Sequence, residues 1–318
     1  MPTWGQILGE IHQQIQSGDI RAFDTIRNKY IKILADFTQR DTIIYATRWT
    51  SGDVPPNLIS ITDEDIHAFM EAVAGLKCEN LDLIIHTGGG SAESTDAIVS
   101  YLRSKFKNIR VIIPQAAMSA GTMLACSADI IVMGKQSSIG PIDPQFILQT
   151  AAGVQSIPAH SILEQFKKAQ DDCRDNPKNL NSWLPILSQY GPALLVNCIN
   201  QITFGKELVG NWLKAYMFKD ETTDLPDKIA DFLSNHANFK THGKHINMET
   251  ARGIGLKIEQ LESSQEFQDK VLSAFHATMH ILTSTNTAKV VANHNGNCFL
   301  KQFMPIPMIG KQPSQQQV

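Results

Sequence analysis

Cysteine, aromatic side chains and charge are all scarce in this chain of 318 residues. The five cysteines are odd in number and widely spaced, without a Cys-x-x-Cys pair, which argues against a disulfide framework or a zinc knuckle and favours a reducing compartment. Charged residues make up only 19% and the net charge is −3, whereas a general nucleic-acid binder would be basic. We therefore expect no nucleic-acid partner and a cytoplasmic location.

The sequence also lacks a secretory signal and an uninterrupted membrane span. Its first residues show no basic start followed by an apolar stretch. The most apolar window, residues 111–134, approaches the ~20 apolar residues that a spanning helix needs. Pro114, Ser119, Gly121 and Asp129 interrupt that window. We expect no integral membrane segment, and peripheral association with a membrane stays compatible with the sequence.

What the sequence does contain is an alternation of strand and helix patterns over residues 41–133. Such alternation predicts βαβ units and a mostly parallel sheet, and thus an α/β fold. Hydrophobic residues make up 42%, which is enough to bury a sizeable core. The expected parts are an N-terminal helical segment 1–38, a core 39–260 with a helical insertion at about 165–240, a C-terminal helical extension 261–304 and a disordered tail 305–318.

Two short motifs lie one βαβ step apart, and each follows an apolar strand and opens a helix. The first is His86-Thr-Gly-Gly-Gly-Ser, and the second is Ala117-Met-Ser-Ala-Gly-Thr, which contains Ser119. Glycines after a strand let a ligand approach the backbone and leave N–H groups free at the helix start. A serine beside such donors supplies a nucleophile and an oxyanion hole, which acyl transfer requires.

Other glycine-loop chemistries fit these motifs less well. A phosphate loop needs Gly-Lys-Ser/Thr, but Ser91-Ala92 follows the glycines, and the third glycine of a dinucleotide fingerprint is missing. A serine among small residues is commonly no more than a tight helix contact. It is the pairing of the two motifs that makes Ser119 a candidate nucleophile.

Two further segments complete a recognisable block, Ala128-Asp-Ile-Ile-Val-Met and Ser138-Ile-Gly-Pro-Ile-Asp-Pro-Gln. The block resembles the Clp-protease/crotonase-like serine peptidases, and within them the serine dehydrogenase proteinase family (SDH proteinases), relatives of signal peptide peptidase A. The similarity covers about residues 42–256. Gly88 departs from it, because related loops usually carry proline at that position.

The resemblance implies a Clp-protease/crotonase-like spiral fold with N-terminal and C-terminal helical additions. It implies Ser119 as nucleophile and oxyanion donors in the backbone of Gly90 and Ala120, with Gly89 beside them. It also implies assembly into a homo-oligomer and a reaction that requires neither a metal nor an organic cofactor.

The general base remains open between three candidates. The positions of the Clp histidine and aspartate are occupied here in exchanged order by Asp143 and His242, so that His242 would act as base and Asp143 would orient it. A lysine dyad like that of signal peptide peptidase A would use Lys167 or Lys168, which would need burial to become a base. His160, at the start of the same helix, is the third candidate.

We therefore expect a serine endopeptidase-type hydrolase that acts on a peptide or protein substrate through an acyl-enzyme on Ser119. A non-catalytic peptide-binding or scaffold member of the family is the main alternative. A crotonase-type acyl-CoA enzyme, which uses the same oxyanion amides without a serine nucleophile, is a third possibility. His242 and His245 form a His-x-x-His pair near His236, but Gly243 between them makes a helical metal site doubtful.

Overall fold

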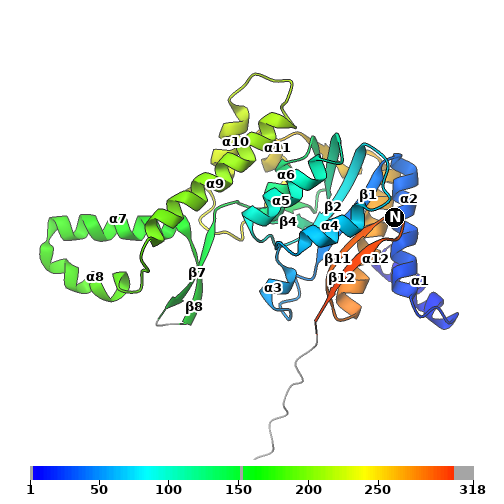
Figure 1. The fold of residues 1–318 in the computed structure, drawn as a ribbon, viewed down its shortest axis with the longest axis horizontal. Coiled ribbons are helices and arrows are strands. Elements are labelled where there is room, and N and C mark those ends of the chain that lie inside the picture. The colour runs from blue at the N-terminus through cyan, green and yellow to red at the C-terminus, as the bar shows by residue number, and fades with distance from the viewer. Residues whose placement is uncertain (1–2, 151–152, 304–318) are drawn as a thin grey trace, which may run out of the picture.

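The computed structural model describes residues 3–150 and 153–303, which are built around a seven-stranded sheet (Figure 1). The strand order is β10-β5-β3-β2-β1-β11-β12. The first five of these strands are mutually parallel, whereas β11 pairs antiparallel with β1 and β12 antiparallel with β11. The expected α/β fold with a mostly parallel sheet is thereby confirmed. The strands are β1 (Asp41–Thr47), β2 (Asn80–His86), β3 (Asn108–Ile113), β5 (Ile130–Met133), β10 (Ile258–Gln260), β11 (Thr287–Asn293) and β12 (Cys298–Gln302).

The central strands are buried on both faces, because successive side chains point to opposite sides of the sheet. In β1, Ile43 and Tyr45 join one hydrophobic core, while Ile44 and Ala46 join the other. These four side chains are completely buried. Helices must therefore cover both faces, and they do.

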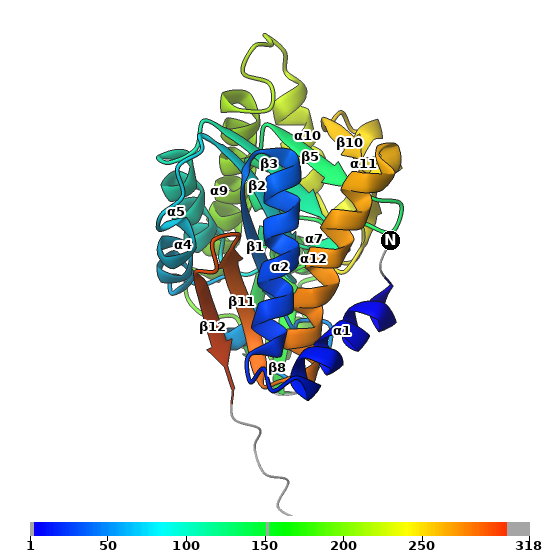
Figure 2. The ribbon, with the colours of Figure 1, turned by 90° about the vertical axis from the view of Figure 1, so that its right-hand side faces the viewer.

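One face of the sheet is covered by α2 and α12, with α1 packed beside them (Figure 2). The opposite face carries α4, α5, α6, α9 and α10. In α2, Ile26, Tyr30 and Leu34 recur at four-residue spacing and form the buried stripe of an amphipathic helix. The helices of the body are α1 (Trp4–Gln16), α2 (Ala22–Thr38), α3 (Pro56–Ile59), α4 (Asp65–Val73), α5 (Ala92–Arg103), α6 (Ala120–Cys126), α9 (Leu194–Ala215), α10 (Leu225–Ser234), α11 (Met248–Gly253) and α12 (Gln265–Ser284).

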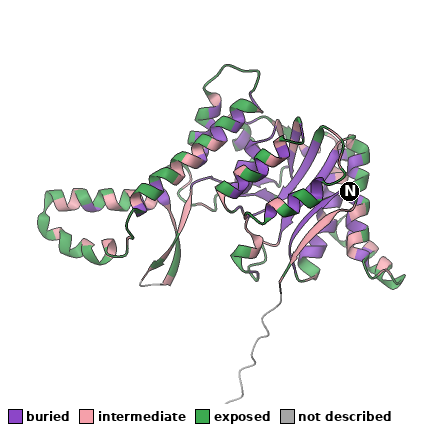
Figure 3. Cartoon of the chain, viewed as in Figure 1, coloured by how far each residue is buried: buried purple, intermediate pink, exposed green. Residues whose placement is uncertain are grey.

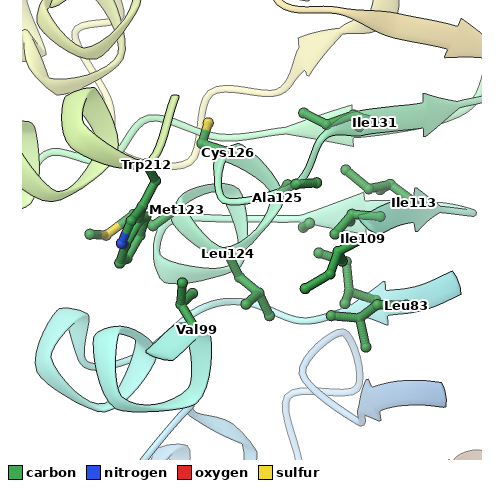
Figure 4. Close-up of a cluster of buried hydrophobic side chains, with 14 of the residues drawn as sticks. Leu83, Val99, Ile109, Ile113, Met123, Leu124, Ala125, Cys126, Ile131 and Trp212 are labelled. Atoms are coloured by element: carbon green, nitrogen blue, oxygen red, sulfur yellow. The ribbon is translucent and has the colours of Figure 1, made fainter. Parts of the chain in front are cut away.

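The short helix α6 lies in the middle of the core between the sheet and helices α4, α5 and α9. All seven of its residues are buried. Leu124 and Met123 lie among side chains from the sheet, from α5 and from α9, including Trp212 (Figure 4). Small residues such as Ala120 and Ala125 let the helix sit this deep. The turn that opens α6 is consequently held by the core rather than by solvent-exposed loops.

A second, three-stranded sheet lies beside the start of α6. Its order is β4-β6-β9, with β4 at Ala116–Ala117, β6 at Ser138–Ile139 and β9 at Ile246–Asn247. This small sheet brings together the segment before Ser119, the segment before Asp143 and the segment after His242. Residues that are more than 120 positions apart in sequence thus meet at one place.

An arm projects from the body (Figure 1). It consists of the hairpin β7 (Gln145–Thr150) and β8 (Gly153–Pro158), helices α7 (Ala159–Asp175) and α8 (Leu180–Leu187), and the first turns of α9. Most of its surface is exposed (Figure 3), and its own core is small, with Ala159, Ile162, Leu194 and Cys198 as the buried residues. The helical insertion expected at about 165–240 overlaps this arm, although the arm begins earlier with strands. The domain boundaries stay predictions.

Two strands at the end of the described chain were not expected from the sequence. The segment 261–304 was predicted to be helical, and α12 is, but β11 and β12 follow it and extend the main sheet. Lys289 and Asn293 make β11 hard to recognise from the sequence, because they are polar residues in a fully buried strand. The Lys289 ammonium donates to Asp65 and to the carbonyl of Ser60, at 2.7 and 2.9 Å.

Among the described helices, none combines the length and the hydropathy that crossing a bilayer demands. The tail 305–318, for which disorder was expected, lies outside the described residues.

Candidate active site

The glycine loop after β2 is shaped by two close approaches of backbone. Gly89 has φ +102°, and a Cβ there would lie 2.7 Å from both the Met118 carbonyl oxygen and the Ser119 Cβ. A Cβ on Gly90 would lie 2.3 Å from the backbone N and O of Ile61. Ile61 also ties the loop down, since its N–H donates to Gly89 O at 2.8 Å and its carbonyl accepts from Ser91 N–H at 3.0 Å. Only glycine fits at both positions.

Ser119 stands at a sharp turn between β4 and α6. Its backbone has φ +50° and ψ −119°, a conformation that side-chain-bearing residues rarely adopt and that tertiary structure must hold in place. Two bonds fix this turn, from Met118 N–H to Thr87 O at 2.9 Å and from Gly121 N–H to Met118 O at 2.8 Å. The Ser119 side chain is half-buried and, within the described chain, makes no capping hydrogen bond to the start of α6. A strained strand–turn–helix of this kind presents a hydroxyl to a cleft.

Two backbone N–H groups next to this hydroxyl are free. Within the described ranges, neither the Gly90 N–H nor the Ala120 N–H donates a hydrogen bond, whereas the Gly89 N–H is used by Thr87 Oγ1 at 3.1 Å. Ala120 opens α6, and the first N–H groups of a helix have no partner inside the helix. Gly90 and Ala120 therefore remain as candidate oxyanion donors, with Gly89 supplying the turn between them.

Ser119 opens into a cleft of about 720 Å3 that runs between the glycine loop and the root of the arm. His242 lines the same cleft. It lies 99 positions from Asp143 in sequence, but it contacts this residue of the loop after β6. Apolar side chains make up much of the remaining wall, and they include Trp49, Ile59, Ile61, Met123, Ile142, Phe146 and Ile147. The cleft therefore offers apolar contacts next to Ser119.

Asp143 connects two histidines below the cleft. It is completely buried, in the loop between β6 and β7, and its Oδ1 lies 2.8 Å from His242 Nδ1. Its other oxygen, Oδ2, lies 2.9 Å from His236 Nδ1 and accepts from Gln145 Nε2 at 3.0 Å. Since a buried carboxylate needs hydrogen-bond donors, these three side chains make its charged form tenable. His242 is thereby oriented with Nδ1 on the carboxylate and Nε2 on the far side of the ring.

The other candidate bases lie in different surroundings. His160, at the start of α7, is half-buried; burial lowers its pKa, and the nearby charges of Asp143 and His236 act in opposite directions on it. Lys167 and Lys168 are exposed on α7, and neither is among the described residues that line the cleft. His245 is occupied with Ser138, at 2.6 Å between Nδ1 and Oγ.

Sequence reasoning missed three contributors to this site. His236 was considered only as a metal ligand, and its contact with Asp143 depends on the path of the chain after α10. Thr87 and Ile61 fix the glycine loop through a hydroxyl and a strand-like backbone pairing, and neither stands out in sequence. Across residues 3–150 and 153–303, no group of three or more His, Cys, Asp or Glu side chains is arranged to hold a metal ion.

The arrangement is that of a serine hydrolase: a strained serine at a helix start, free N–H groups beside it and a carboxylate-bound histidine in one cleft. A profile of the ClpP-like SDH-type serine proteinases matches residues 56–269, more than half of the chain. The chain belongs to this family, as the motifs had predicted.

Sequence relatives include two uncharacterized proteins of Methanocaldococcus jannaschii. One is 30% identical over 200 residues, which are 63% of this chain and 60% of the relative. The second is 38% identical over 117 residues, which are 36% of this chain and 37% of the relative. The matched part of this chain thus spans less than two thirds of either relative.

Solved structures of the 1510-N membrane-bound stomatin-specific protease are also similar. One has a TM-score of 0.38 at 16% identity and covers 66% of this chain and 79% of its own. Another, in complex with a substrate peptide, has a TM-score of 0.29 at 17% identity and covers 68% and 93%.

Proposed function

We propose that the protein is a serine endopeptidase that cleaves peptides or proteins through an acyl-enzyme on Ser119. The observation that supports this most is the pairing of His242 with the fully buried Asp143 at the edge of the cleft that Ser119 also lines. A serine hydroxyl needs a base to become a nucleophile, and a neutral histidine oriented by a carboxylate is such a base.

In the proposed reaction, Ser119 Oγ attacks the scissile carbonyl carbon while His242 Nε2 takes the hydroxyl proton. The carbonyl oxygen becomes negative and accepts hydrogen bonds from the N–H groups of Gly90 and Ala120. Preorganised amides of this kind stabilise the negative oxygen strongly. His242 then passes its proton to the leaving amine as the C–N bond breaks. Water, deprotonated by the same histidine, then attacks the ester carbonyl. The bond from the carbonyl carbon to Ser119 Oγ breaks, the histidine returns its proton to Oγ, and the carboxylic acid product leaves.

No hydrogen bond joins Ser119 to His242 within the described chain, and this is consistent with a resting site, since such bonds often tighten only when substrate is bound. The substrate class follows from the cleft wall. Trp49, Met123 and Ile142 offer apolar contacts, so we infer a preference for extended peptide segments with apolar side chains.

A library of fluorescence-quenched peptides tests this proposal. The native protein and the Ser100→Ala variant, which alters an exposed serine on α5 away from the cleft, should cleave peptides with apolar residues. Ser119→Ala should cleave none of them. Equal cleavage by Ser119→Ala would refute the proposed nucleophile, and the absence of cleavage by every variant would favour the non-catalytic alternative.

Homo-oligomeric assembly and a cytoplasmic location stay predictions. Sedimentation velocity measured over a range of protein concentrations tests the first. A species of the monomer mass alone, at all concentrations, would contradict it.

A further inference from the structure

One carboxylate in this site serves two imidazoles. His242 takes Oδ1 of Asp143 and His236 takes Oδ2, both through Nδ1, at 2.8 and 2.9 Å. The aspartate is completely buried, whereas the His242 and His236 side chains are 28% and 15% exposed. A triad needs only one of these contacts. The second histidine calls for a physical role.

His236 is placed so that it reaches the carboxylate but not the substrate. It opens a 3-10 turn, His236–Asn238, directly after α10, and its carbonyl accepts from the N–H groups of Phe239 and Lys240. Among the described residues, the wall of the cleft includes His242 but not His236. We therefore expect His236 to act on the reaction through Asp143 rather than by contact with the substrate.

The proposed reaction requires an uncharged donor at this position. With both histidines neutral, Asp143 carries one negative charge, and the imidazolium that forms on His242 during the reaction is balanced by it. A proton on His236 would place a second positive charge on the same carboxylate and oppose that imidazolium. Among the described residues, the titratable groups that interact with His236 include Asp143 itself, His160 at the start of α7 and, across the carboxylate, His242.

We propose that His236 is a positioning residue which, as a neutral donor, holds Asp143 in the rotamer that aims Oδ1 at His242. The proposed catalytic network then comprises four residues, Ser119, His242, Asp143 and His236. Gln145 donates to the same oxygen as His236 but, as an amide on the adjacent loop, carries no proton that titrates. This proposal rests on the proposed peptidase function.

Two substitutions separate positioning from packing. His236→Gln retains an N–H donor, whereas His236→Ala removes it. We expect His236→Ala to lower kcat by about tenfold to a hundredfold, the cost of a lost hydrogen bond to a buried charge, with little change in KM. His236→Gln should restore activity to within about threefold of the native protein, because a neutral donor is what the carboxylate needs.

The pH profile supplies a readout that packing alone would not move. A carboxylate with one donor fewer holds a proton, or an imidazolium partner, more strongly. The acid limb of kcat/KM should therefore lie at higher pH in His236→Ala than in the native protein, and less so in His236→Gln. A limb that does not move, together with equal losses in both variants, would overturn the positioning role.

The same substitution in the His242→Ala background completes the test. Without His242, Asp143 has no base to orient, so His236→Ala should cause no further loss of the residual activity. An equal loss in both backgrounds would overturn the proposal. Ser119→Ala is measured alongside: if it remains active, the peptidase mechanism itself has failed, whereas an inactive Ser119→Ala with a fully active His236→Ala refutes His236 alone.

Discussion

Gly89 and Ser119 lie against each other so closely that a Cβ on Gly89 would fall 2.7 Å from the Cβ of Ser119. The strained turn of Ser119 and the left-handed turn of Gly89 are thus in van der Waals contact, and the Ser119 side chain occupies the space that a side chain on Gly89 would need. The glycine loop leaves the Gly90 N–H free, and its Gly89 backbone also packs against the turn of Ser119.

This contact predicts that Gly89→Ala is more damaging than an ordinary glycine substitution. The new methyl group must displace the Ser119 turn and also adopt φ +102°, which should lower the free energy of unfolding by about 1–3 kcal/mol. Peptidase activity should fall to background. Chemical unfolding and a cleavage assay on the same preparation check both effects.

Gly75→Ala is the matched control. Gly75 also has a positive φ, +79°, but a Cβ there meets nothing within 4 Å. It should cost about 1 kcal/mol of stability from strain alone and leave activity intact. If both variants behave alike, the contact with Ser119 has no functional meaning.

A second prediction concerns the tautomer of His242. Asp143→Asn keeps the size of the side chain but can turn an N–H toward Nδ1, so the ring would carry its proton on Nε2 and lose its basic nitrogen on the cleft side. The expected loss in kcat is about 10^3- to 10^4-fold, without a comparable change in KM. Steady-state kinetics on the best peptide measure it, and a loss below tenfold would argue against the triad.

A third prediction tests the lysine alternative. Lys167 and Lys168 are exposed on α7, and exposed substitutions seldom matter, so Lys167→Ala and Lys168→Ala should each keep activity within about twofold of the native value. His242→Ala, compared in the same assay, should be nearly inactive. Loss of activity in a lysine variant instead would indicate a dyad completed in some other arrangement of the arm.

Acid stability provides a fourth prediction, through a histidine outside the proposed catalytic network. Burial lowers the pKa of His86, at the end of β2, to about 4. The unfolded chain takes up this proton near pH 6.5 and the folded chain only near 4, so stability is lost as the pH falls through that window. At pH 5 this one group lowers the free energy of unfolding by about 2 kcal/mol relative to its value at neutral pH.

Unfolding in urea at pH 7 and pH 5 measures this effect, with His86→Phe as the comparison. Phenylalanine retains the ring between Trp49 and Phe275, whose centroids lie 5.7 and 5.3 Å from that of His86. The variant should therefore lose less stability than the native protein on acidification. Identical pH dependence in the two proteins would show that His86 does not titrate as the structure indicates.

The parts of the site that are local in sequence could be predicted from the residues themselves, and the parts that depend on chain path could not. The glycine loop and Ser119 are each a strand end followed by a helix start, and the residue types alone indicate that geometry. The Asp143–His242 pair was predicted only through the family resemblance, as one of three alternatives for the base, and the Asp143–His236 contact was not predicted. Both contacts depend on where α9 and α10 return the chain to the body. No spacing in the sequence encodes that return.

The fold shows the same division. The parallel strands β1, β2 and β3 are short segments rich in apolar and β-branched residues, and strands were predicted at 41–46, 81–86 and 109–113. The strand β11 was missed because Lys289 and Asn293 look solvent-exposed in sequence, although Asp65 and the Ala72 carbonyl satisfy them in the core. A buried polar residue whose partner lies over 200 positions away is invisible to a local pattern.

The most direct test of the account is to map the adduct of a fluorophosphonate probe by peptide mass spectrometry. We expect modification of Ser119 in the native protein and in Ser100→Ala, much slower modification in His242→Ala, and none in Ser119→Ala. Modification of another residue, or labelling that persists in Ser119→Ala, would contradict it.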